Sequence, residues 1–221
     1  MTAQQRLRIS FGKGNSIKYI SHLDLHATWE RAFRRAGIPL AYSQGFNPQA
    51  KLQLAAALPV GYTGRAELMD IFLDTPLTAD MLEERLKPNL PAGLTVASIE
   101  EVDLKAPSLQ ASLAQAEYVV TMEQPGAAAE EIQQRVAQFL EASTWEQQRQ
   151  RKGRMETIDL RPLVLCLTID EPAQSAESLI LRMRVVAGQA ANVRPDTVLE
   201  ALGLPTTAHQ TDRTELVFGF D

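Results

Sequence analysis

Residues 6 to 37, RLRISFGKGNSIKYISHLDLHATWERAFRRAG, form the stretch that decides the fold of the N-terminal half of the chain. Its first six residues alternate as a strand, and a glycine-containing turn follows. A helix is predicted to begin at Ser21, with Asp24 in the capping-box position and Gly37 at the C-terminal cap. Apolar residues recur at helical spacing and form one face of this helix, at Leu25, Trp29, Ala32, Phe33 and Ala36.

The segments after this helix extend the order to strand, helix, strand, strand, helix, strand. One additional short strand-like run has no certain place in that order. The predicted elements are strands near residues 39–43, 50–58 and 66–74, a helix over 78–87 and a closing strand over 94–104.

The second half of the chain repeats this order after an alanine-, serine- and glutamine-rich connection at residues 105–116. The predicted elements are strands over 117–123, 156–169, 178–187 and 214–220, with helices over 127–142 and 195–202. Two βαββαβ patterns predict an α+β protein of two tandem ferredoxin-like sandwiches with antiparallel sheets, over residues 1–106 and 117–221.

A Tyr-Ser-Gln-Gly-Phe-Asn-Pro turn at residues 42–48 follows the first helix. Gly45 can take a positive φ, and Asn47-Pro48 favours a turn, so the segment is either a binding loop or a rigid structural corner. We expect a mixed case, with Phe46 packed inside and Ser43, Gln44 and Asn47 presented beside Arg35 and Lys51.

The charge of the chain is unevenly distributed. Residues 1–51 carry eight lysines and arginines against two acidic residues, while the whole chain has a net charge of −5. Such a concentrated positive field suits a phosphate-bearing or carboxylate-bearing partner. A solvated basic face is the alternative. A second basic cluster lies around Gly153, at Arg149, Arg151, Lys152 and Arg154, where we expect a hairpin or flexible loop with Arg161 at its edge.

Composition and apolar runs narrow the possible classes of protein. At 45% apolar residues the chain can form a substantial core. No apolar run reaches the length of a membrane span, and the N-terminus lacks the apolar centre of a signal peptide, so we expect a cytoplasmic protein with no membrane partner. Cys166 is predicted to be a small buried hydrophobe. Asp70, in an apolar strand, is predicted to be a buried carboxylate that pairs with an arginine.

Three stretches closely resemble a radical-SAM-linked bacterial family, the domain of unknown function 2344. They are KYISHLDL at 18–25, RAFRRAGIPLAYSQGFNP at 31–48 and LPVG at 58–61. The later RKGR at 151–154 and IDLRP at 158–162 also look like the family, so the resemblance covers nearly the whole chain. The resemblance implies a domain fused to, or encoded beside, a radical S-adenosylmethionine protein. Gln49-Ala50-Lys51 stands where the family tends to show Pro-x-Pro-Lys.

The duplicated ferredoxin-like pattern with a basic helix and a glycine-containing loop is also similar to the RNA-binding repeat-associated proteins of CRISPR systems, as a fold-level analogy. Arginines would contact phosphates, and Tyr42 or Phe46 would stack on an unpaired base. The predicted nucleic-acid-binding residues are Lys18, Arg31, Arg34, Arg35, Tyr42, Ser43, Gln44, Phe46, Asn47, Lys51, Arg151, Lys152 and Arg154.

Catalysis has little support in the sequence. His22, Asp24 and His26 form His-x-Asp-x-His, but a structural His22 at the helix start is the simpler interpretation, and His209 is not placed near them. We therefore predict no metal and no cofactor in this chain, with His22 as a weak catalytic candidate.

The sequence favours a non-catalytic accessory module that binds or presents structured RNA, such as tRNA, for a radical-SAM partner. Two alternatives remain open. One is a metal-independent ribonuclease that uses His22, and the other is a protein-docking module that contacts the radical-SAM protein only.

Overall fold

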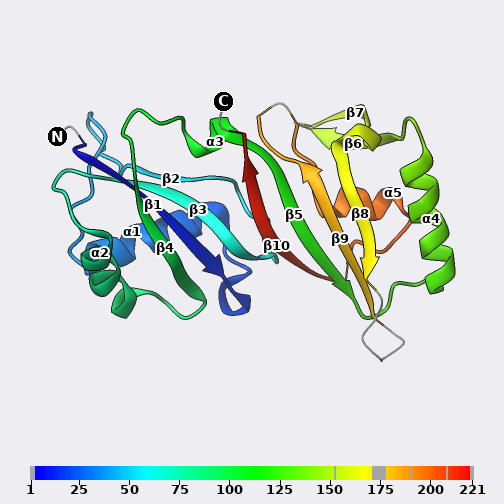
Figure 1. The fold of residues 1–221 in the computed structure, drawn as a ribbon, viewed down its shortest axis with the longest axis horizontal. Helices are drawn as coiled ribbons and strands as arrows, with labels where there is room; N and C mark the ends of the chain where they lie inside the picture. Colours follow the sequence, from blue (N-terminus) through cyan, green and yellow to red (C-terminus); the bar gives the residue numbers. More distant parts are fainter. Residues whose placement is uncertain (1–2, 152, 171–177, 190, 208, 220–221) are drawn as a thin grey trace. The chain divides into compact units, whose positions relative to one another are not determined.

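The computed structural model describes residues 3–151, 153–170, 178–189, 191–207 and 209–219 (Figure 1). The chain divides into two compact units, Met1–Leu113 with Phe218–Asp221, and Ala114–Val217, which we call unit 1 and unit 2. Helices and a mostly antiparallel sheet make up each unit. Within the described residues, no helix is both long and apolar enough to cross a membrane.

In unit 1, β1 pairs antiparallel with both β3 and β4, and β2 pairs with β3. The strand order is thus β4-β1-β3-β2. The elements are β1 (Gln5–Lys13), η1 (Asn15–Ile17), α1 (His22–Arg35), β2 (Leu52–Leu54), β3 (Thr63–Leu73), α2 (Ala79–Leu86), η2 (Lys87–Asn89), β4 (Leu94–Val102) and α3 (Leu109–Ser112).

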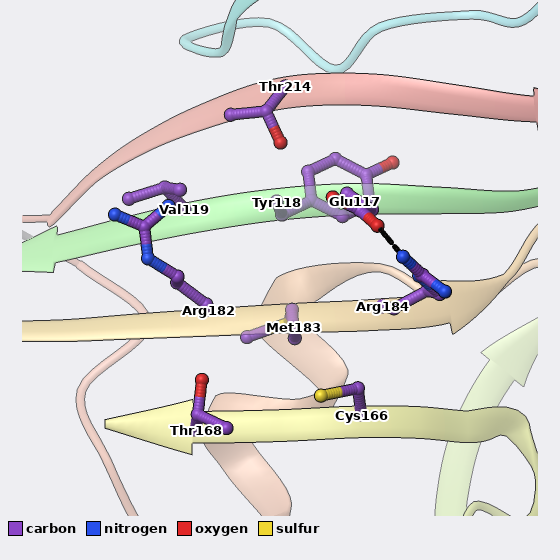
Figure 2. Close-up of a pocket in the computed structure, with 9 residues that line it drawn as sticks. All are labelled: Glu117, Tyr118, Val119, Cys166, Thr168, Arg182, Met183, Arg184 and Thr214. Atoms are coloured by element: carbon purple, nitrogen blue, oxygen red, sulfur yellow. Dashed lines mark hydrogen bonds and ion pairs between the residues drawn. The ribbon is translucent and has the colours of Figure 1, made fainter. Parts of the chain in front are cut away.

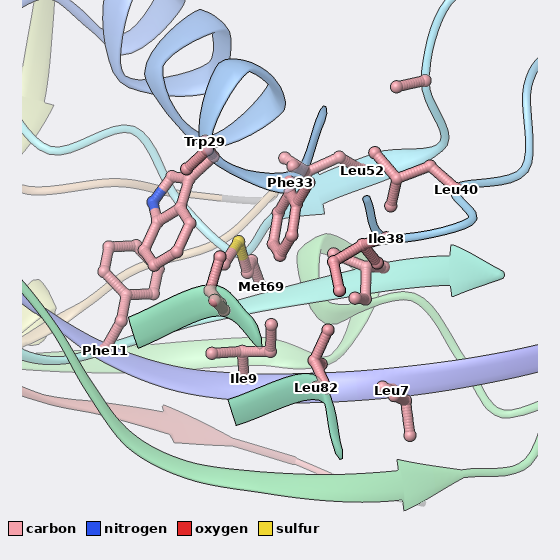
Figure 3. Close-up of a cluster of buried hydrophobic side chains, with 14 of the residues drawn as sticks. Leu7, Ile9, Phe11, Trp29, Phe33, Ile38, Leu40, Leu52, Met69 and Leu82 are labelled. Atoms are coloured by element: carbon pink, nitrogen blue, oxygen red, sulfur yellow. The ribbon is translucent and has the colours of Figure 1, made fainter. Parts of the chain in front are cut away.

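Helix α1 begins and packs as its sequence predicts. Ser21 is the N-cap and forms a reciprocal capping box with Asp24. The buried arc of the helix lies against β1 and β3, and Figure 3 shows Trp29 and Phe33 directed toward the strands. The ring of Trp29 lies 5.1 Å from that of Phe11 and 5.6 Å from that of Phe33, measured between centroids. These aromatic contacts fix α1 on the sheet.

The capping box makes the stability of α1 depend on pH. Hydrogen bonds from the Ser21 hydroxyl and backbone hold the pKa of the Asp24 carboxyl below its usual value of 3.8. A carboxyl with a lowered pKa in the folded state contributes stability that is present above its unfolded pKa and is lost as pH falls through the folded pKa.

We therefore expect Asp24→Asn to lower the melting temperature at neutral pH. The difference from the unchanged protein should shrink as the pH falls below 3.8, because the wild-type carboxyl then takes up a proton and becomes neutral, like the asparagine side chain. Thermal melts followed by circular dichroism over an acid series would test this. Ser21→Ala is the matched control and should weaken the same pH dependence, whereas a difference that stays constant through the acid range would contradict the prediction.

The strands predicted between residues 39 and 58 are shorter than expected. Leu40 and Tyr42 form isolated bridges, to Leu73 and Ala50, rather than a strand over 39–43. Only Leu52–Leu54 of the predicted 50–58 run pairs with β3 as β2. The apolar run beyond it, which ends at the buried Leu58, forms a bend and irregular backbone instead of a strand. Apolar composition alone therefore overestimated strand length here.

Buried Asp70 confirms the expectation of an arginine-paired carboxylate. Its side chain is fully buried on β3, and Arg6 Nη2 and Arg8 Nε of β1 approach its two oxygens at 2.5 and 2.9 Å. Arg6 also donates to the carbonyl oxygens of Ala106 and Pro107, at 2.6 and 2.9 Å. The Asp70 carboxylate thus binds both arginines, and Arg6 also binds the backbone of the segment that follows β4.

In unit 2, β5 lies between β10 and β9, and β8 follows β9, whereas β6 and β7 form a separate hairpin (Figure 1). The elements are β5 (Leu113–Met122), α4 (Ala129–Glu141), β6 (Glu146–Arg151), β7 (Arg154–Asp159), η3 (Arg161–Leu163), β8 (Val164–Asp170), β9 (Leu179–Val186), α5 (Pro195–Ala201) and β10 (His209–Phe218). The hairpin confirms one of the two forms expected around Gly153.

Two expectations for unit 2 are wrong. The strand predicted over 156–169 is two strands, because η3, with Pro162 in its first turn, interrupts the pairing. Cys166 is exposed rather than buried. A register shift between Val164 and Cys166 in the pairing of β8 with β9 breaks the simple alternation, so Leu165 and Cys166 are exposed while Leu167 is buried.

Candidate nucleic-acid interface

The segment from Tyr42 to Ala50 is a tight hairpin-like loop. Ser43 and Gln49 are joined twice: the Ser43 amide donates to the Gln49 carbonyl at 2.8 Å, and the Gln49 amide donates to the Ser43 hydroxyl at 2.9 Å. Gly45 has a φ of 131°, a value that side-chain-bearing residues rarely adopt. The loop is therefore closed by its own hydrogen bonds and turned at a glycine.

Phe46 is fully exposed at the tip of this loop, with a relative exposure of 112%. The expectation that it packs inside is wrong, because the loop is exposed from Gln44 to Gln49 and the ring lies in solvent. Gln44 and Asn47 are exposed, as expected, and Tyr42 is 39% exposed at the base of the loop. Two aromatic rings are thus accessible in one short segment, which is an arrangement that suits base stacking.

The arginines of α1 lie at its exposed C-terminal end, directly before the chain enters this loop. Arg31, Arg34 and Arg35 are all exposed. Arg31 donates to the Thr28 hydroxyl at 3.0 Å, and Arg35 Nη2 donates to the carbonyl of Asn89 at 2.8 Å. Two of the three guanidinium groups are thereby oriented by neutral oxygen atoms, and the Asp24 carboxylate also interacts with Arg31 through its charge.

The structure adds Arg85, which the sequence analysis did not identify. Asn89 accepts from Arg35 through its carbonyl and donates through its side-chain amide to the Arg85 carbonyl at 2.9 Å. Arg85 is exposed on α2, four residues before Asn89. Lys87 is exposed in η2 beside it. The contact of η2 with α1, through Asn89 and Arg35, brings the end of α2 to the end of α1.

Other predicted residues lie elsewhere. The Lys18 ammonium sits 5.3 Å from the Tyr19 ring centroid, and the Lys18 carbonyl accepts from the Gly61 amide at 2.9 Å, just before β3 begins. The loop at 42–48 instead adjoins the far end of β3, because the Ala41 amide bonds to the Phe72 carbonyl. Lys18 is therefore not brought together with the loop.

Lys51 also lies at the loop end of β3. Its amide donates to the Ala41 carbonyl at 2.8 Å, and its carbonyl accepts from the Phe72 amide at 3.1 Å. The residue is half-buried beside the base of the loop. This position agrees with the expectation that Lys51 lies near the turn.

The basic hairpin of unit 2 is described in its backbone only. Arg151 pairs with Arg154 across β6 and β7. Lys152 and the side chains of Arg151 and Arg154 lie outside the described residues. Arg161 has a structural role, since its guanidinium donates to the carbonyls of Leu140 and Val164 at 3.0–3.2 Å.

The positive field of the first 51 residues is smaller at the surface than the sequence predicts. Arg6, Arg8 and Lys13 are buried. Lys13 donates from Nζ to the carbonyl oxygens of Lys18 and Ile20, at 3.0 and 3.4 Å. The cations that remain for a partner are Lys18, Arg31, Arg34, Arg35 and Lys51, with Lys18 and Lys51 partly covered.

The histidines do not form a metal site within the described residues. His22 and His26 lie one turn apart on α1, and Asp24 is engaged in the capping box. His209 pairs with Asp196 in unit 2, with 3.3 Å between Nε2 and Oδ1. In the part of the chain that the structure describes, no group of three or more His, Cys, Asp and Glu side chains is placed to hold a metal ion.

A shallow hollow of about 270 Å³ lies on the sheet of unit 2 (Figure 2). Arg182 pairs with Asp170 at 2.5 Å, and Arg184 pairs with Glu117, a contact that raises the pKa of the Arg184 guanidinium. Glu215 also acts on Arg184, so carboxylates balance the arginines around this hollow. It is not a basic surface, and none of the predicted binding residues lines it.

Comparison with known proteins identifies the family. Residues 6–195 match the family described as uncharacterized protein conserved in bacteria (DUF2344). The chain belongs to this family. The match confirms that the motifs in the sequence resemble this family. A comparison with curated proteins gives no match.

Several solved structures are similar to the chain in fold. A chain in a crystal structure of a Cbf5-Nop10-Gar1 complex aligns with a TM-score of 0.52 and 13% identity, over 95% of this chain and 48% of that one. A chain in a structure of an H/ACA RNP bound to a substrate RNA containing 2'-deoxyuridine aligns with a TM-score of 0.49 and 12% identity, over 95% and 47%. This chain thus spans about half the length of the solved chains it matches, and at this identity the likeness concerns fold alone.

Proposed function

We propose that this DUF2344 protein binds structured RNA, such as tRNA, through the loop at 42–48 and the arginines at the C-terminal end of α1. The observation that supports this most strongly is the complete exposure of Phe46 at the tip of a loop closed by hydrogen bonds. An aromatic ring held in solvent has no role in the core, and it offers a face to an unpaired base. The exposed arginines supply the charge that phosphates require.

The proposal includes two tandem ferredoxin-like domains, over residues 1–106 and 117–221. The observed strand orders support it. Unit 1 has the order β4-β1-β3-β2, and unit 2 has the order β10-β5-β9-β8. If the β6–β7 hairpin is taken as an insertion, both orders place the fourth strand of the unit beside the first, then the third, then the second.

We further propose that the protein works in the cytoplasm as a non-catalytic accessory of a radical S-adenosylmethionine protein. In that role this chain holds the RNA and needs no cofactor of its own, while the partner carries the chemistry. The proposed partner follows from the resemblance of the motifs at 18–25 and 31–48 to a radical-SAM-linked family.

A salt titration tests the RNA-binding role. Changing Arg31 and Arg34 together to alanine should weaken binding to tRNA across sequences and should reduce the slope of log affinity against log salt by about one unit per lost phosphate contact. Fluorescence anisotropy at several salt concentrations measures both quantities.

A variant with Arg182→Ala and Arg184→Ala is the matched control. It removes two exposed arginines from the charge-balanced hollow of unit 2 and should leave the slope unchanged. If the unchanged protein shows no affinity for tRNA at low salt, the RNA-binding proposal is overturned. If Arg31→Ala/Arg34→Ala leaves the slope unchanged, α1 is not part of the interface.

A further inference from the structure

We propose that the interface selects RNAs in which an unpaired nucleotide adjoins a helical stem. This inference rests on the proposed RNA binding and specifies its substrate class. It depends on a difference in chemistry between two parts of the site. One part is a strip of guanidinium groups at the ends of α1 and α2, which we call the arginine strip and define as Arg31, Arg35 and Arg85. The other part is the aromatic loop at 42–48.

Hydrogen bonds orient two members of the arginine strip, Arg31 and Arg35. Arg31 and Arg35 lie four residues apart on α1 and share one flank of the helix. The carbonyl of Asn89 holds Arg35 at 2.8 Å, and the side chain of Asn89 holds the backbone of Arg85 at 2.9 Å. One asparagine therefore links the two helices at these residues, and its carbonyl lowers the entropy that the Arg35 guanidinium loses when it meets a phosphate backbone.

The strip contacts phosphates rather than bases. Guanidinium groups on a convex helical surface meet the backbone of a stem, and such contacts position an RNA without reading its sequence. Because A-form stems hide their base edges in a deep, narrow major groove, a stem offers these arginines mainly phosphates and ribose. The strip alone therefore binds helical RNAs of any sequence.

The loop adds the requirement for an unpaired nucleotide. Within a stem both faces of each internal base are covered by neighbouring bases, so Phe46 can stack only on a base that has left the helix or lies at an end. The double hydrogen bond between Ser43 and Gln49 keeps the tip of the loop extended. Phe46 is therefore presented to a partner without a preceding rearrangement of the loop.

Three synthetic RNAs of equal length test this inference: a hairpin with a fully paired stem, a hairpin with the same loop and ends in which one stem pair is replaced by a mismatch that leaves its nucleotides unpaired, and an unstructured single strand. Equal length keeps the number of phosphates constant. We expect the RNA with the unpaired nucleotide to bind roughly 5- to 150-fold more tightly than the paired hairpin, which is the value of one stacked base.

Two variants assign this preference to the two parts of the site. Phe46→Ala should remove the preference and leave the affinity for the paired hairpin unchanged. Arg85→Ala should weaken binding to both hairpins by the same factor and reduce the salt slope by roughly 0.7–0.9 unit. Thermal melts of both variants should match the unchanged protein, because both side chains are exposed.

Each other outcome has a distinct meaning. Equal binding of the two hairpins by the unchanged protein overturns this inference and leaves the proposed RNA binding intact. Tightest binding of the single strand also overturns it, because the stem then contributes nothing. No binding of any RNA at low salt overturns the proposed function itself. Displacement of the RNA by a poly-glutamate peptide at equal charge concentration would identify an unselective anion surface and overturn the inference.

Discussion

Replacing Asp70 by alanine is expected to lower the free energy of unfolding by about 3–5 kcal/mol, the cost of removing one partner from a buried ion pair. Asp70 is fully buried, and Arg6 and Arg8, at 2% and 8% exposure, both direct their guanidinium groups to it. Without the carboxylate, two positive charges remain in a site from which water is largely excluded. Urea unfolding followed by tryptophan fluorescence measures the loss, since Trp29 lies in the same unit.

Asp74→Ala is the matched control. Asp74 lies directly after the same strand and is only half-buried, and its carboxylate accepts from the Thr75 hydroxyl at 3.1 Å. Its removal should change the unfolding free energy by less than about 0.5 kcal/mol, as for most surface substitutions. A similar small loss for Asp70→Ala would mean that Asp70 does not hold the arginines in solution.

Phe46→Ala should weaken RNA binding by about 1–3 kcal/mol while the unfolding free energy stays nearly the same. The ring is fully exposed, so its removal leaves no cavity. A buried aromatic ring such as that of Phe33 would instead cost about 3–5 kcal/mol of stability when truncated. The pair of measurements, RNA affinity by anisotropy and stability by urea unfolding, separates a stacking platform from a structural anchor.

Phe46→Trp provides the positive control, because indole also presents an aromatic face and should retain affinity. Asn47→Ala tests the polar part of the loop. If Asn47→Ala folds and binds RNA normally, then Asn47 has no part in recognition, and the loop acts through its aromatic rings alone. If Phe46→Ala binds RNA as tightly as the unchanged protein, the loop is not the site.

The sequence predicts correctly those helices and strands that are marked by residues close together along the chain. The Ser21–Asp24 capping box and the apolar arc of α1 mark that helix correctly, and the order of elements along unit 1, β1-α1-β2-β3-α2-β4, follows the predicted succession. Where the pattern depends on a partner strand, prediction fails. Cys166 is exposed because β8 changes register against β9, and this shift leaves no trace in the apolar run that contains the cysteine.

In the candidate site, too, features that depend on contacts between distant parts of the chain could not be predicted from the sequence. The sequence left the exposure of Phe46 open, because an apolar residue in a turn can either pack inside the protein or be presented to a partner. Arg85 was not identified, because a single arginine in a short helix has no pattern, and it joins the arginine strip only through Asn89. Conversely, Arg6 and Arg8 counted toward a surface charge although both are buried and share the carboxylate of Asp70. Net charge along a chain therefore overestimates the field that a partner meets.

The strand order of unit 2 affects how the protein is made on the ribosome. Its β5 lies between β9 and β10. Both edges of β5 can therefore be paired only after β10, the last strand of the chain, has been synthesised. All four sheet strands of unit 1 have been synthesised by Val102, while β10 begins only at His209. At roughly 5–20 residues per second, unit 1 has several seconds to fold before unit 2 is complete. During that interval the unpaired edge of β5 is open to wrong strands, so unit 2 is where a nascent chain most needs protection from aggregation.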